Sequence, residues 1–525
     1  MKIAVEGCAH GELEKIYECV ETLQEREGIK VDLLICCGDF QSVRNNDDLR
    51  AMAVPEKYHN ICTFYKYYSG EKVAPILTIF IGGNHEASNY LQELPFGGWV
   101  APNIYYLGRA GVVQFGNLRL GGLSGIFKNH DYLQGLWESP PYTPNSLRSV
   151  YHIRSLDVFR LSQLKEKVHV MLSHDWPRGI TNYGDKNNLL RRKPFFREDI
   201  ESNKLGSPPA EQLLNKVKPD YWFAAHLHCQ FAALVKHDDN SETKFLALDK
   251  CLPKRRHLQI LDLPAEFAGD KQLKHDLEWL AILKNTNHLL SVKNIDCHLP
   301  GPGCNERYDF TPTQEEKDMV LKLMGSLTIS NDSFVQTAPT YRPNTPKRAP
   351  YEAILNPQTA TLCDKLCIDD PLQVVLARSG RTMKQPVIIE HSESIEGNGE
   401  IPKTPIKCSP MTLPAPVTPC QNEDLSETVS ALNYSRNSFL SESEIVTSEC
   451  ETPPQTNKMV FKRRNLAMYT PEDVETGSNT SGSQACLLSD WSVGTEVVPL
   501  CTTLLHTPAG QESLQPPLIR GHRAD

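Results

Sequence analysis

The sequence has no long apolar run. No window of its 525 residues approaches the ~20 apolar residues that a membrane-spanning helix needs. The first residues, MKIAVEGCAHGE, contain no basic segment followed by an apolar one, so we expect no secretory signal. We therefore expect a soluble intracellular protein that makes no membrane contact.

The chain is also poor in hydrophobic residues for a protein that is folded throughout. They make up 40% of it, and it contains 37 prolines. That combination indicates a globular part and an unstructured part. Ser, Thr, Pro, Glu and Asn dominate after about residue 335, where the hydrophobic periodicity ends. We predict a disordered tail over residues 335–525.

Neither a disulfide framework nor an excess of positive charge is present. The 16 cysteines are scattered along a long chain, unlike those of a small secreted disulfide protein. We expect the cysteines from Cys8 to Cys37 to be buried or metal-ligating thiols in a reducing compartment. The net charge of −9 argues weakly against a general nucleic-acid coat. It averages over the tail, however, and does not describe a local groove.

Short apolar runs alternate with helical stretches over residues 1–230. The strand-like runs cover residues 2–7, 31–36, 75–81, 168–173 and 221–225. Between the first two, apolar residues recur at helical spacing over residues 12–28, and Gly28 ends the helix. This order predicts a largely parallel sheet with functional loops beyond the carboxyl ends of its strands.

Glycines break the pattern over residues 104–123, which predicts antiparallel hairpins. A mixed α/β fold with a mixed sheet or a two-sheet sandwich is therefore favoured over a doubly wound sheet. Two long loops, 125–148 and 178–209, interrupt the domain, and loops of this length are usually functional. Beyond them, residues 245–263 predict a strand pair, and residues 275–290 and 312–327 predict helices.

Metal-binding residue types stand at the ends of the five strand-like runs. In chain order these are Gly7-Cys8-Ala9-His10, Gly38-Asp39, Gly83-Asn84-His85-Glu86, Ser173-His174 and Ala225-His226-Leu227-His228. A lone buried histidine is more often a core residue than a ligand. Five such signals in order, each at a strand end, are hard to produce by chance, so we predict one composite metal site.

The spacing indicates how the ligands divide. Residues i and i+2 at an extended strand end point to the same side, so Cys8/His10 and His226/His228 can each hold one metal ion. Asp39 has two oxygens and can bridge two ions. Seven candidate ligands exceed the needs of one tetrahedral zinc and suit a pair of ions ~3.5–4 Å apart.

This series resembles the calcineurin-like metallophosphoesterases, whose usual pattern is D-x-H, GD, GNH, a lone His and G-H-x-H. Two positions depart from it: Cys8 replaces the first Asp, and Ala225 replaces a Gly. Cys8, the GIFKNHDY segment from Gly125 and the LDKCLPKRR segment from Leu248 are similar to the RNA lariat debranching enzymes. The resemblance implies a helix-flanked β-sandwich catalytic domain (1–232), a smaller C-terminal domain (233–334) and the tail.

That resemblance implies metal-dependent hydrolysis of the 2′–5′ phosphodiester at the branch point of intron lariats. It assigns the metal to Cys8, His10, Asp39, Asn84, His174, His226 and His228, and catalysis to His85. The His85 role is either general acid to the 2′-oxygen or a hydrogen bond to the phosphate. A Cys8 thiolate favours Fe²⁺ and Zn²⁺, with Mn²⁺ as a substitute, over Mg²⁺. The alternative is that Cys8 lies just outside bonding distance.

RNA contacts are expected from the two long loops. Aromatic side chains can stack on unpaired bases and cations can bind phosphates; the alternative for the aromatics is packing beneath the loop. The candidates are Gly125, Ile126, Phe127, Lys128, Tyr132, Trp137, Tyr142 and Arg148 in the first loop, and Arg191, Arg192 and Lys193 in the second.

Two other functions remain open: another phosphoesterase (a phosphomonoesterase or protein phosphatase), and a non-catalytic scaffold of this fold. Branched intron lariat RNA as substrate implies a nuclear protein, with shuttling to the cytoplasm and with spliceosome-associated or tail-binding partners. The basic clusters beginning at Lys254 and Lys462 are weak nuclear signals. Candidate phosphorylation sites precede prolines at Thr404, Ser409, Thr418, Thr452, Thr470 and Thr507.

Overall fold

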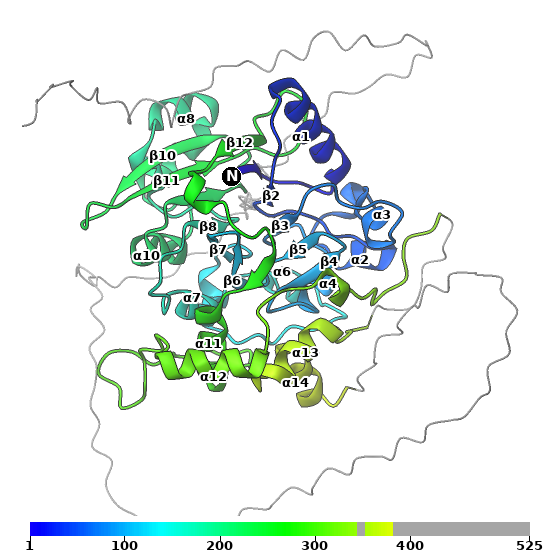
Figure 1. Ribbon diagram of the computed structural model, residues 1–525, viewed down its shortest axis with the longest axis vertical. Coiled ribbons are helices and arrows are strands. Elements are labelled where there is room, and N and C mark those ends of the chain that lie inside the picture. The colour runs from blue at the N-terminus through cyan, green and yellow to red at the C-terminus, as the bar shows by residue number, and fades with distance from the viewer. Residues whose placement is uncertain (344–351, 382–525) are drawn as a thin grey trace, which may run out of the picture. The chain divides into compact units, whose positions relative to one another are not determined.

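Two mixed β-sheets face each other across the centre of the molecule (Figure 1). The computed structural model describes residues 1–343 and 352–381. The first sheet contains β1 (Lys2–Glu6), β2 (Leu33–Cys36), β3 (Thr78–Phe80), β4 (Gly98–Ala101), β5 (Ile104–Tyr106) and β12 (Leu258–Asp262), in the order β12-β1-β2-β3-β5-β4. Strands β1, β2, β3 and β5 run parallel, and the two edge strands run antiparallel to them.

The second sheet has seven strands and is also parallel at its centre. It contains β6 (Ala110–Phe115), β7 (Leu118–Leu123), β8 (Val170–Ser173), β9 (Tyr221–Ala224), β10 (Phe231–Lys236), β11 (Glu242–Ala247) and β13 (Leu273–His275), in the order β10-β11-β9-β8-β7-β6-β13. Strands β7, β8, β9 and β11 are parallel, while β6, β10 and β13 are antiparallel to their neighbours.

Alternation along the strands divides the core into three layers. Ile3 and Val5 of β1 pack between the sheets with Val170 and Leu172 of β8. Ala4, between the two β1 residues, faces the opposite side of the first sheet. Successive side chains of a strand point to opposite faces, so each sheet buries both of them.

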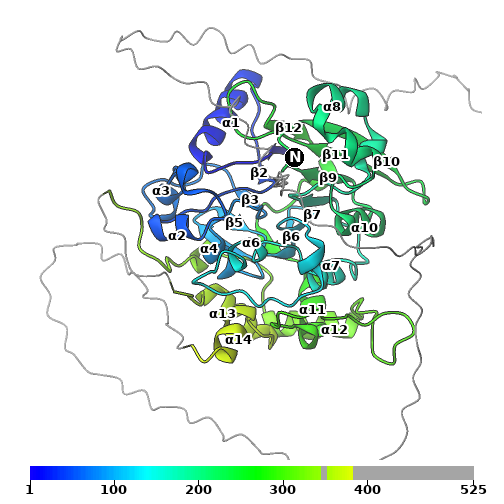
Figure 2. The same ribbon diagram turned by 180° about the vertical axis from the view of Figure 1, so that it is seen from behind.

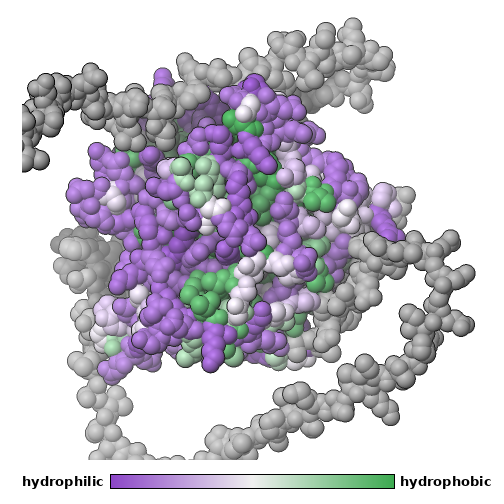
Figure 3. All heavy atoms as spheres, in the orientation of Figure 1, coloured by the Kyte–Doolittle hydropathy of each residue, from purple (hydrophilic) through white to green (hydrophobic). Residues whose placement is uncertain are grey.

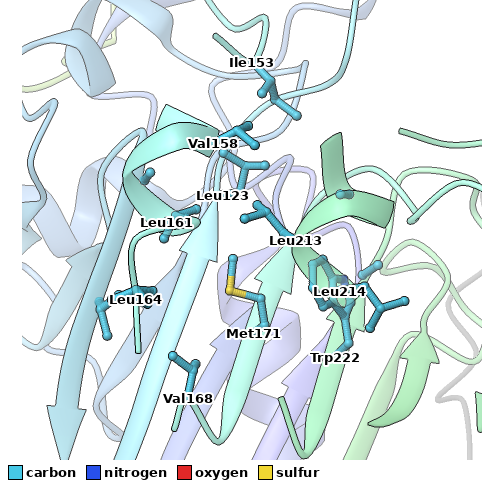
Figure 4. Close-up of a cluster of buried hydrophobic side chains, with 14 of the residues drawn as sticks. Leu123, Ile153, Val158, Leu161, Leu164, Val168, Met171, Leu213, Leu214 and Trp222 are labelled. Carbon is cyan, nitrogen blue, oxygen red and sulfur yellow. The ribbon is translucent and has the colours of Figure 1, made fainter. Parts of the chain in front are cut away.

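Helices cover the two outer faces. Helices α1 (Leu13–Glu27), α3 (Phe64–Tyr68) and α4 (Ser88–Gln92) pack on the first sheet, with α2 (Asn46–Arg50) beside them. Helices α7 (Ser155–Leu161) and α10 (Pro208–Val217) cover the second sheet (Figures 1 and 2). In Figure 4, Leu161 of α7 and Leu213 of α10 meet Met171 and Trp222 of strands β8 and β9.

The remaining helices lie in the loops and at one end of the molecule. The loops carry α5 (Asn129–Tyr132), α6 (Ser146–Ser149), α8 (Lys186–Arg192) and α9 (Arg197–Glu201). Helices α11 (Leu277–Asn285), α12 (Gln314–Met324), α13 (Pro357–Leu366) and α14 (Pro371–Arg378) gather at one end in both Figures 1 and 2.

Among the described residues, no helix combines the length and apolarity that crossing a membrane requires. Hydrophilic residues cover most of the face in Figure 3, with small hydrophobic patches between them.

The five predicted strand runs are confirmed as β1, β2, β3, β8 and β9, and the first predicted helix is α1. Gly28 ends that helix in the left-handed region, with φ 62°. The two-sheet sandwich is confirmed as well. The strand pair predicted over residues 245–263 is wrong, because β11 and β12 belong to different sheets.

Residues 335–343 and 352–381 are described and contain two helices, so the predicted start of the tail at residue 335 is wrong for them. The prolines that suggested disorder stand in the first helical turn: Pro357 follows the N-cap Asn356 and Pro371 follows the N-cap Asp370. Leu366 of α13 is fully buried against the core of the second sheet. Residues 382–525, with the candidate phosphorylation sites and the Lys462 cluster, lie outside the described residues.

The predicted division at residues 232 and 233 falls inside β10 (Phe231–Lys236). Strands β10 and β11 complete one edge of the second sheet, and β12 and β13 complete an edge of each sheet. The described part of the chain therefore folds as one compact unit.

Candidate metal centre

The predicted ligand residues meet at the carboxyl ends of β1, β2, β3, β8 and β9. Four of them lie in the left-handed backbone region: His10 (φ 46°), Asp39 (φ 47°), His226 (φ 65°) and His228 (φ 49°). A residue other than glycine is uncommon in this region, and several in one place mark a functional site.

Asp39 lies at the centre of the site and is fully buried. Its Oδ1 atom accepts hydrogen bonds from the backbone N–H groups of Asn84 (3.0 Å) and His85 (2.9 Å). The same oxygen is 3.3 Å from His174 Nε2, whereas Oδ2 is 3.7 Å from His10 Nε2. The two carboxylate oxygens thus face different histidines, as a bridging ligand requires.

The Oδ2 side of Asp39 faces the first ligand group, which consists of Cys8, His10, Asp39 and His228. One ligand atom from each lies within 4.8 Å of the others. His10 Nε2 is 3.2 Å from His228 Nε2, so two ring nitrogens converge. The Cys8 sulfur, fully buried, accepts a hydrogen bond from the His226 N–H at 3.2 Å.

The Oδ1 side faces Asn84, His174 and His226. Asn84 Oδ1 and His174 Nε2 are buried and have no hydrogen-bond partner. The other ring nitrogen of His174 is 2.8 Å from the Cys37 carbonyl oxygen, so it carries the proton and leaves the Nε2 lone pair exposed to the site. The rings of His174 and His226 are 5.0 Å apart. Unpaired buried acceptors in such a set are what divalent cations satisfy, so the residues fit two ions.

The prediction that His226 and His228 hold one ion together is wrong. His228 belongs with Cys8 and His10, while His226 lies beside His174. The reason is the backbone: with φ values of 65° and 49°, the two residues are not on an extended strand, so the same-side relation of residues i and i+2 does not hold for them. The Cys8/His10 pair does converge as predicted.

The electrostatics keep His10, His226 and His228 neutral and the carboxylate charged, whereas burial of His174 is outweighed by Asp39, which raises the pKa of that histidine. Burial lowers the pKa of His10 to about 4, of His226 to about 3 and of His228 to about 2, which leaves their lone pairs free at neutral pH. Burial by itself would raise the pKa of Asp39, but the neighbouring His174 and His85 outweigh it and hold that pKa well below its usual range.

Glycine is required where the loops approach one another. A Cβ on Gly83 would lie 2.2 Å from Asp39 Oδ1, and one on Gly38 (φ 107°) would lie 2.3 Å from His174 Nδ1. Glu86, which ties these loops together, was not among the predicted site residues. Its carboxylate accepts the backbone N–H groups of Phe40, Gln41 and Gly83, each at 2.8 Å. Its place at the end of the GNHE run was the available signal.

The predicted catalytic residue His85 borders both ligand groups. Its Nδ1 atom is 3.7 Å from Asp39 Oδ2, and its ring centroid is 5.5 Å from that of His10. The side chain remains partly exposed at 14%, so a substrate can reach it. Burial lowers the pKa of His85.

Residues 125–148 form an insert that is anchored at both of its faces. Buried Glu138 pairs with buried Arg154, and Asp131 pairs with His152. On the other side, the Gly135 N–H donates to the Lys293 carbonyl (3.0 Å) of the C-terminal region. The insert therefore has a defined shape rather than being a free loop.

The predicted RNA contacts within the insert divide into two kinds. Packing explains Ile126, which is 6% exposed, and Phe127 and Tyr132, whose rings are 5.5 Å apart against the core. Gly125 (φ 89°) lies against the Tyr151 carbonyl. The other four residues are at least partly exposed to solvent: Lys128, Trp137, Tyr142 and Arg148. Of these, Tyr142 donates a hydrogen bond to Gln92 at 2.6 Å, and Arg148 is exposed.

The second loop places cations beside the metal centre. Arg192 donates to the Gln230 carbonyl oxygen (2.8 Å), and Lys193 acts electrostatically on Cys229, next to His228. Arg191 is exposed on the same helix, α8.

Sequence analysis also missed two side chains near the site. Lys250 acts electrostatically on His10, His85 and His228, and its backbone bridges to Cys8. Burial raises the pKa of Tyr151 to about 12, and Arg148 and Asp39 both act on it electrostatically. Lys250 was visible only as part of the LDKCLPKRR run.

Comparison with known proteins agrees with this arrangement. Residues 1–230 match the family model of calcineurin-like phosphoesterases, and residues 240–371 match that of the lariat debranching enzyme C-terminal domain. A lariat debranching enzyme of Drosophila melanogaster is 46% identical over 90% of this chain and 100% of its own. The chain belongs to the lariat debranching enzyme family. Relatives of the same name from Drosophila pseudoobscura pseudoobscura (79% of this chain, 87% of its own) and Homo sapiens (76% and 74%) are each 50% identical to it.

Membership of the debranching family also accounts for the C-terminal region. The C-terminal match ends at residue 371, where α14 begins, and so includes α13 and the strands β11, β12 and β13. These elements complete both sheets, and they hold Lys250 beside the metal centre.

Proposed function

We propose that this chain hydrolyses the 2′–5′ phosphodiester bond at the branch point of intron lariats and releases linear intron RNA. The observation that carries the proposal is a two-part metal centre with a cysteine in its first ligand group, in a chain of the debranching family. A phosphoesterase fold alone would leave the substrate open.

Two divalent cations would be held by Cys8, His10, Asp39 and His228 on one side and by Asp39, Asn84, His174 and His226 on the other. When bound, such a pair lowers the pKa of a water and neutralises the attacked phosphate. The thiol, a soft donor, favours Fe²⁺ and Zn²⁺, with Mn²⁺ as a substitute. The N–H of His226 supports a thiolate at Cys8 by donating to its sulfur.

His85 would protonate the departing 2′-oxygen. Its backbone N–H is fixed by Asp39, so the ring is held over the site while one edge stays accessible. Lys250 supplies positive charge on the same side, where a phosphate would lie. General acid catalysis of this kind contributes about 10²–10⁴ in rate.

The branched RNA would lie across the insert and the α8 loop. Trp137, Tyr142 and Lys128 face the surface of the insert, and Arg148 extends from it. Arg192 and Lys193 line the other side, beside the His226–His228 turn. Half-buried aromatics and cations beside a metal centre suit an unpaired, branched strand.

A lariat substrate would place the protein in the nucleus, with shuttling to the cytoplasm, near spliceosome-associated proteins. Tail-binding partners and phosphorylation of the Ser/Thr-Pro sites belong to this proposal too. Each follows from the substrate or from the sequence of the tail.

The test is gel analysis of a synthetic 2′–5′ branched RNA incubated with the purified protein. We expect cleavage at the branch alone, and a loss of about 10²–10⁴ in rate for His85→Ala. His298→Ala, the same change at an exposed residue, serves as the matched control. Linear RNA and a phosphopeptide complete the panel: preferential hydrolysis of the phosphopeptide would indicate a protein phosphatase, and no hydrolysis by metal-loaded protein would indicate a scaffold.

A further inference from the structure

A second group of metal-ligating side chains lies on the α1 side of the first sheet. Glu6, Cys251 and His257 are all buried, and one ligand atom from each lies within 4.8 Å of the other two. Cys251 and Cys19, a half-buried residue of α1, both lie near enough to the His257 ring to raise its pKa. Three ligand residues therefore meet, and Cys19 of α1 lies beside the ring of one of them.

This group is distinct from the phosphoesterase centre, although Glu6 is only two residues from Cys8. Glu6 shares its face of β1 with Ala4, which packs towards α1, and Cys251 belongs to the same core layer. Cys8 lies instead in the layer between the two sheets. The first sheet thus separates the two sets of side chains.

Backbone pairing fixes the positions of Glu6, Cys251 and His257. The Gly7 N–H donates to the His257 carbonyl oxygen (2.9 Å), and the Cys251 N–H donates to the Cys8 carbonyl oxygen (3.0 Å). Glu6 itself is in register with Leu258 of β12. The group does not depend on a flexible loop for its geometry.

The Glu6 carboxylate is the observation that points to a ligand. It is fully buried, and its Oε2 atom accepts a hydrogen bond from His257 Nδ1 at 2.8 Å. Its Oε1 atom has no hydrogen-bond partner. A simple Glu–His pair explains Oε2, but it leaves a buried carboxylate oxygen unsatisfied beside two thiols, which is unfavourable.

We propose that Glu6, Cys19, Cys251 and His257 bind one zinc ion at a structural site outside the phosphoesterase centre. Two thiolates, an imidazole and a carboxylate are zinc donors, and four protein ligands close a tetrahedral site. Bond lengths of about 2.0–2.3 Å place such ligand atoms roughly 3.3–3.8 Å apart. The ligand atoms of Glu6, Cys251 and His257 lie within 4.8 Å of one another and need only small side-chain movements to reach that geometry, and Cys19 would turn towards them from α1.

The surroundings support a cation of this kind. Cys19 is half-buried, so an ion can enter from the α1 surface. Lys15, one helical turn before Cys19, acts electrostatically on Cys251 and offsets the negative charge of a site with three anionic donors. Zinc would tie α1 and β1 to residues 251–257, next to Lys250.

Cobalt substitution in a Cys8→Asp background tests the proposal. That background removes the thiol from the phosphoesterase centre, so thiolate-to-cobalt charge-transfer absorption can arise only from other cysteines. We expect about one equivalent of Co²⁺ to give this band and one equivalent of Zn²⁺ to abolish it. The readout is independent of RNA cleavage, so it stands or falls apart from the proposed function.

Three further variants in that background identify the ligands. Cys251→Ser and Cys19→Ser should each lose the band. Cys36→Ser should retain it, because Cys36 is a buried free thiol on the neighbouring strand, outside the proposed set. Cys19 is half-buried on a helix surface, so its variant decides the question if Cys251→Ser does not fold. The proposal is overturned by absence of the band in the background protein, by its persistence in Cys19→Ser, or by a Cys19–Cys251 disulfide in the intact mass.

Discussion

The His226 backbone N–H donates a hydrogen bond to the Cys8 sulfur at 3.2 Å. This contact joins the first and the last motif of the metal centre across 218 positions of the chain. Burial and Asp39 raise the pKa of the Cys8 thiol well above its usual range, and this hydrogen bond opposes them, so it bears on how readily the first ligand group binds a metal ion through a thiolate.

Replacing Cys8 by Asp should therefore change the metal preference. A carboxylate is a harder donor, so activity with Mn²⁺ or Mg²⁺ should rise relative to that with Fe²⁺ or Zn²⁺, by roughly tenfold. Affinity for branched RNA should change less. The measurement is cleavage by metal-free protein reloaded with each ion, with a parallel RNA-binding titration. Identical activation of both proteins by iron, zinc and manganese would contradict this.

Gly83→Ala should disrupt the bridging ligand. The new Cβ would lie 2.2 Å from Asp39 Oδ1, so Asp39 or the Gly83 loop must move. We expect loss of bound metal and a fall in activity of about 10²-fold, in line with misplacement by about 1 Å. Gly301→Ala is the matched control, because its Cβ would meet nothing within 4 Å. Elemental analysis of both variants checks the result, and equal metal content would refute it.

Arg148→Ala should weaken RNA binding without touching the chemistry. This exposed side chain is placed for a phosphate contact, so its loss should reduce the slope of log affinity against log salt by about 1. Hydrolysis of a small aryl phosphodiester should not change. Arg26→Ala, at an exposed residue of α1 outside both loops, is the control. Deleting residues 129–145 is a poorer test, because it removes Glu138 and leaves buried Arg154 without its carboxylate.

Stability should fall in mild acid because of His275. Burial and Lys365 lower the pKa of His275 to about 4 in the folded protein, below the value of 6.5 for a free histidine. The unfolded chain therefore takes up the proton first, and stability is lost as the pH falls from 6.5 towards 4. Between pH 7 and pH 5 this amounts to about 2 kcal/mol.

Urea unfolding at pH 7 and pH 5 measures that effect. The wild-type protein should lose about 2 kcal/mol more than His275→Gln over this interval. His298→Gln, at an exposed position, should behave like the wild type. An identical loss in all three proteins would show that His275 does not titrate in the way described.

Much of the metal centre could be predicted because the ends of strands can be recognised in the sequence. Asp39 and His174 each follow a short apolar run, and parallel strands bring such ends to one edge. The division of His226 from His228 could not be predicted, because it depends on two left-handed residues that a strand pattern does not reveal. Lys250 could not be predicted for a related reason. It lies between β11 and β12, and its contact with Cys8 depends on those two strands joining different sheets.

The missed helices show a different limit. When prolines are only counted, their abundance predicts disorder. Pro357 and Pro371, however, each directly follow the N-cap residue of a helix. Position, rather than abundance, decides whether proline starts a helix or prevents one. An Asn-Pro or Asp-Pro pair followed by apolar residues at helical spacing was the signal in the sequence.

The hydrogen bond from Gly135 to Lys293 has a practical consequence for anyone dissecting the molecule. A fragment ending at residue 230, where the phosphoesterase match stops, would keep every metal ligand but lose four strands and the support of the insert. Such a fragment would be a poor minimal enzyme, and its inactivity would be uninformative about the chemistry. Removing the residues after 381 instead would leave in place every helix and strand described above.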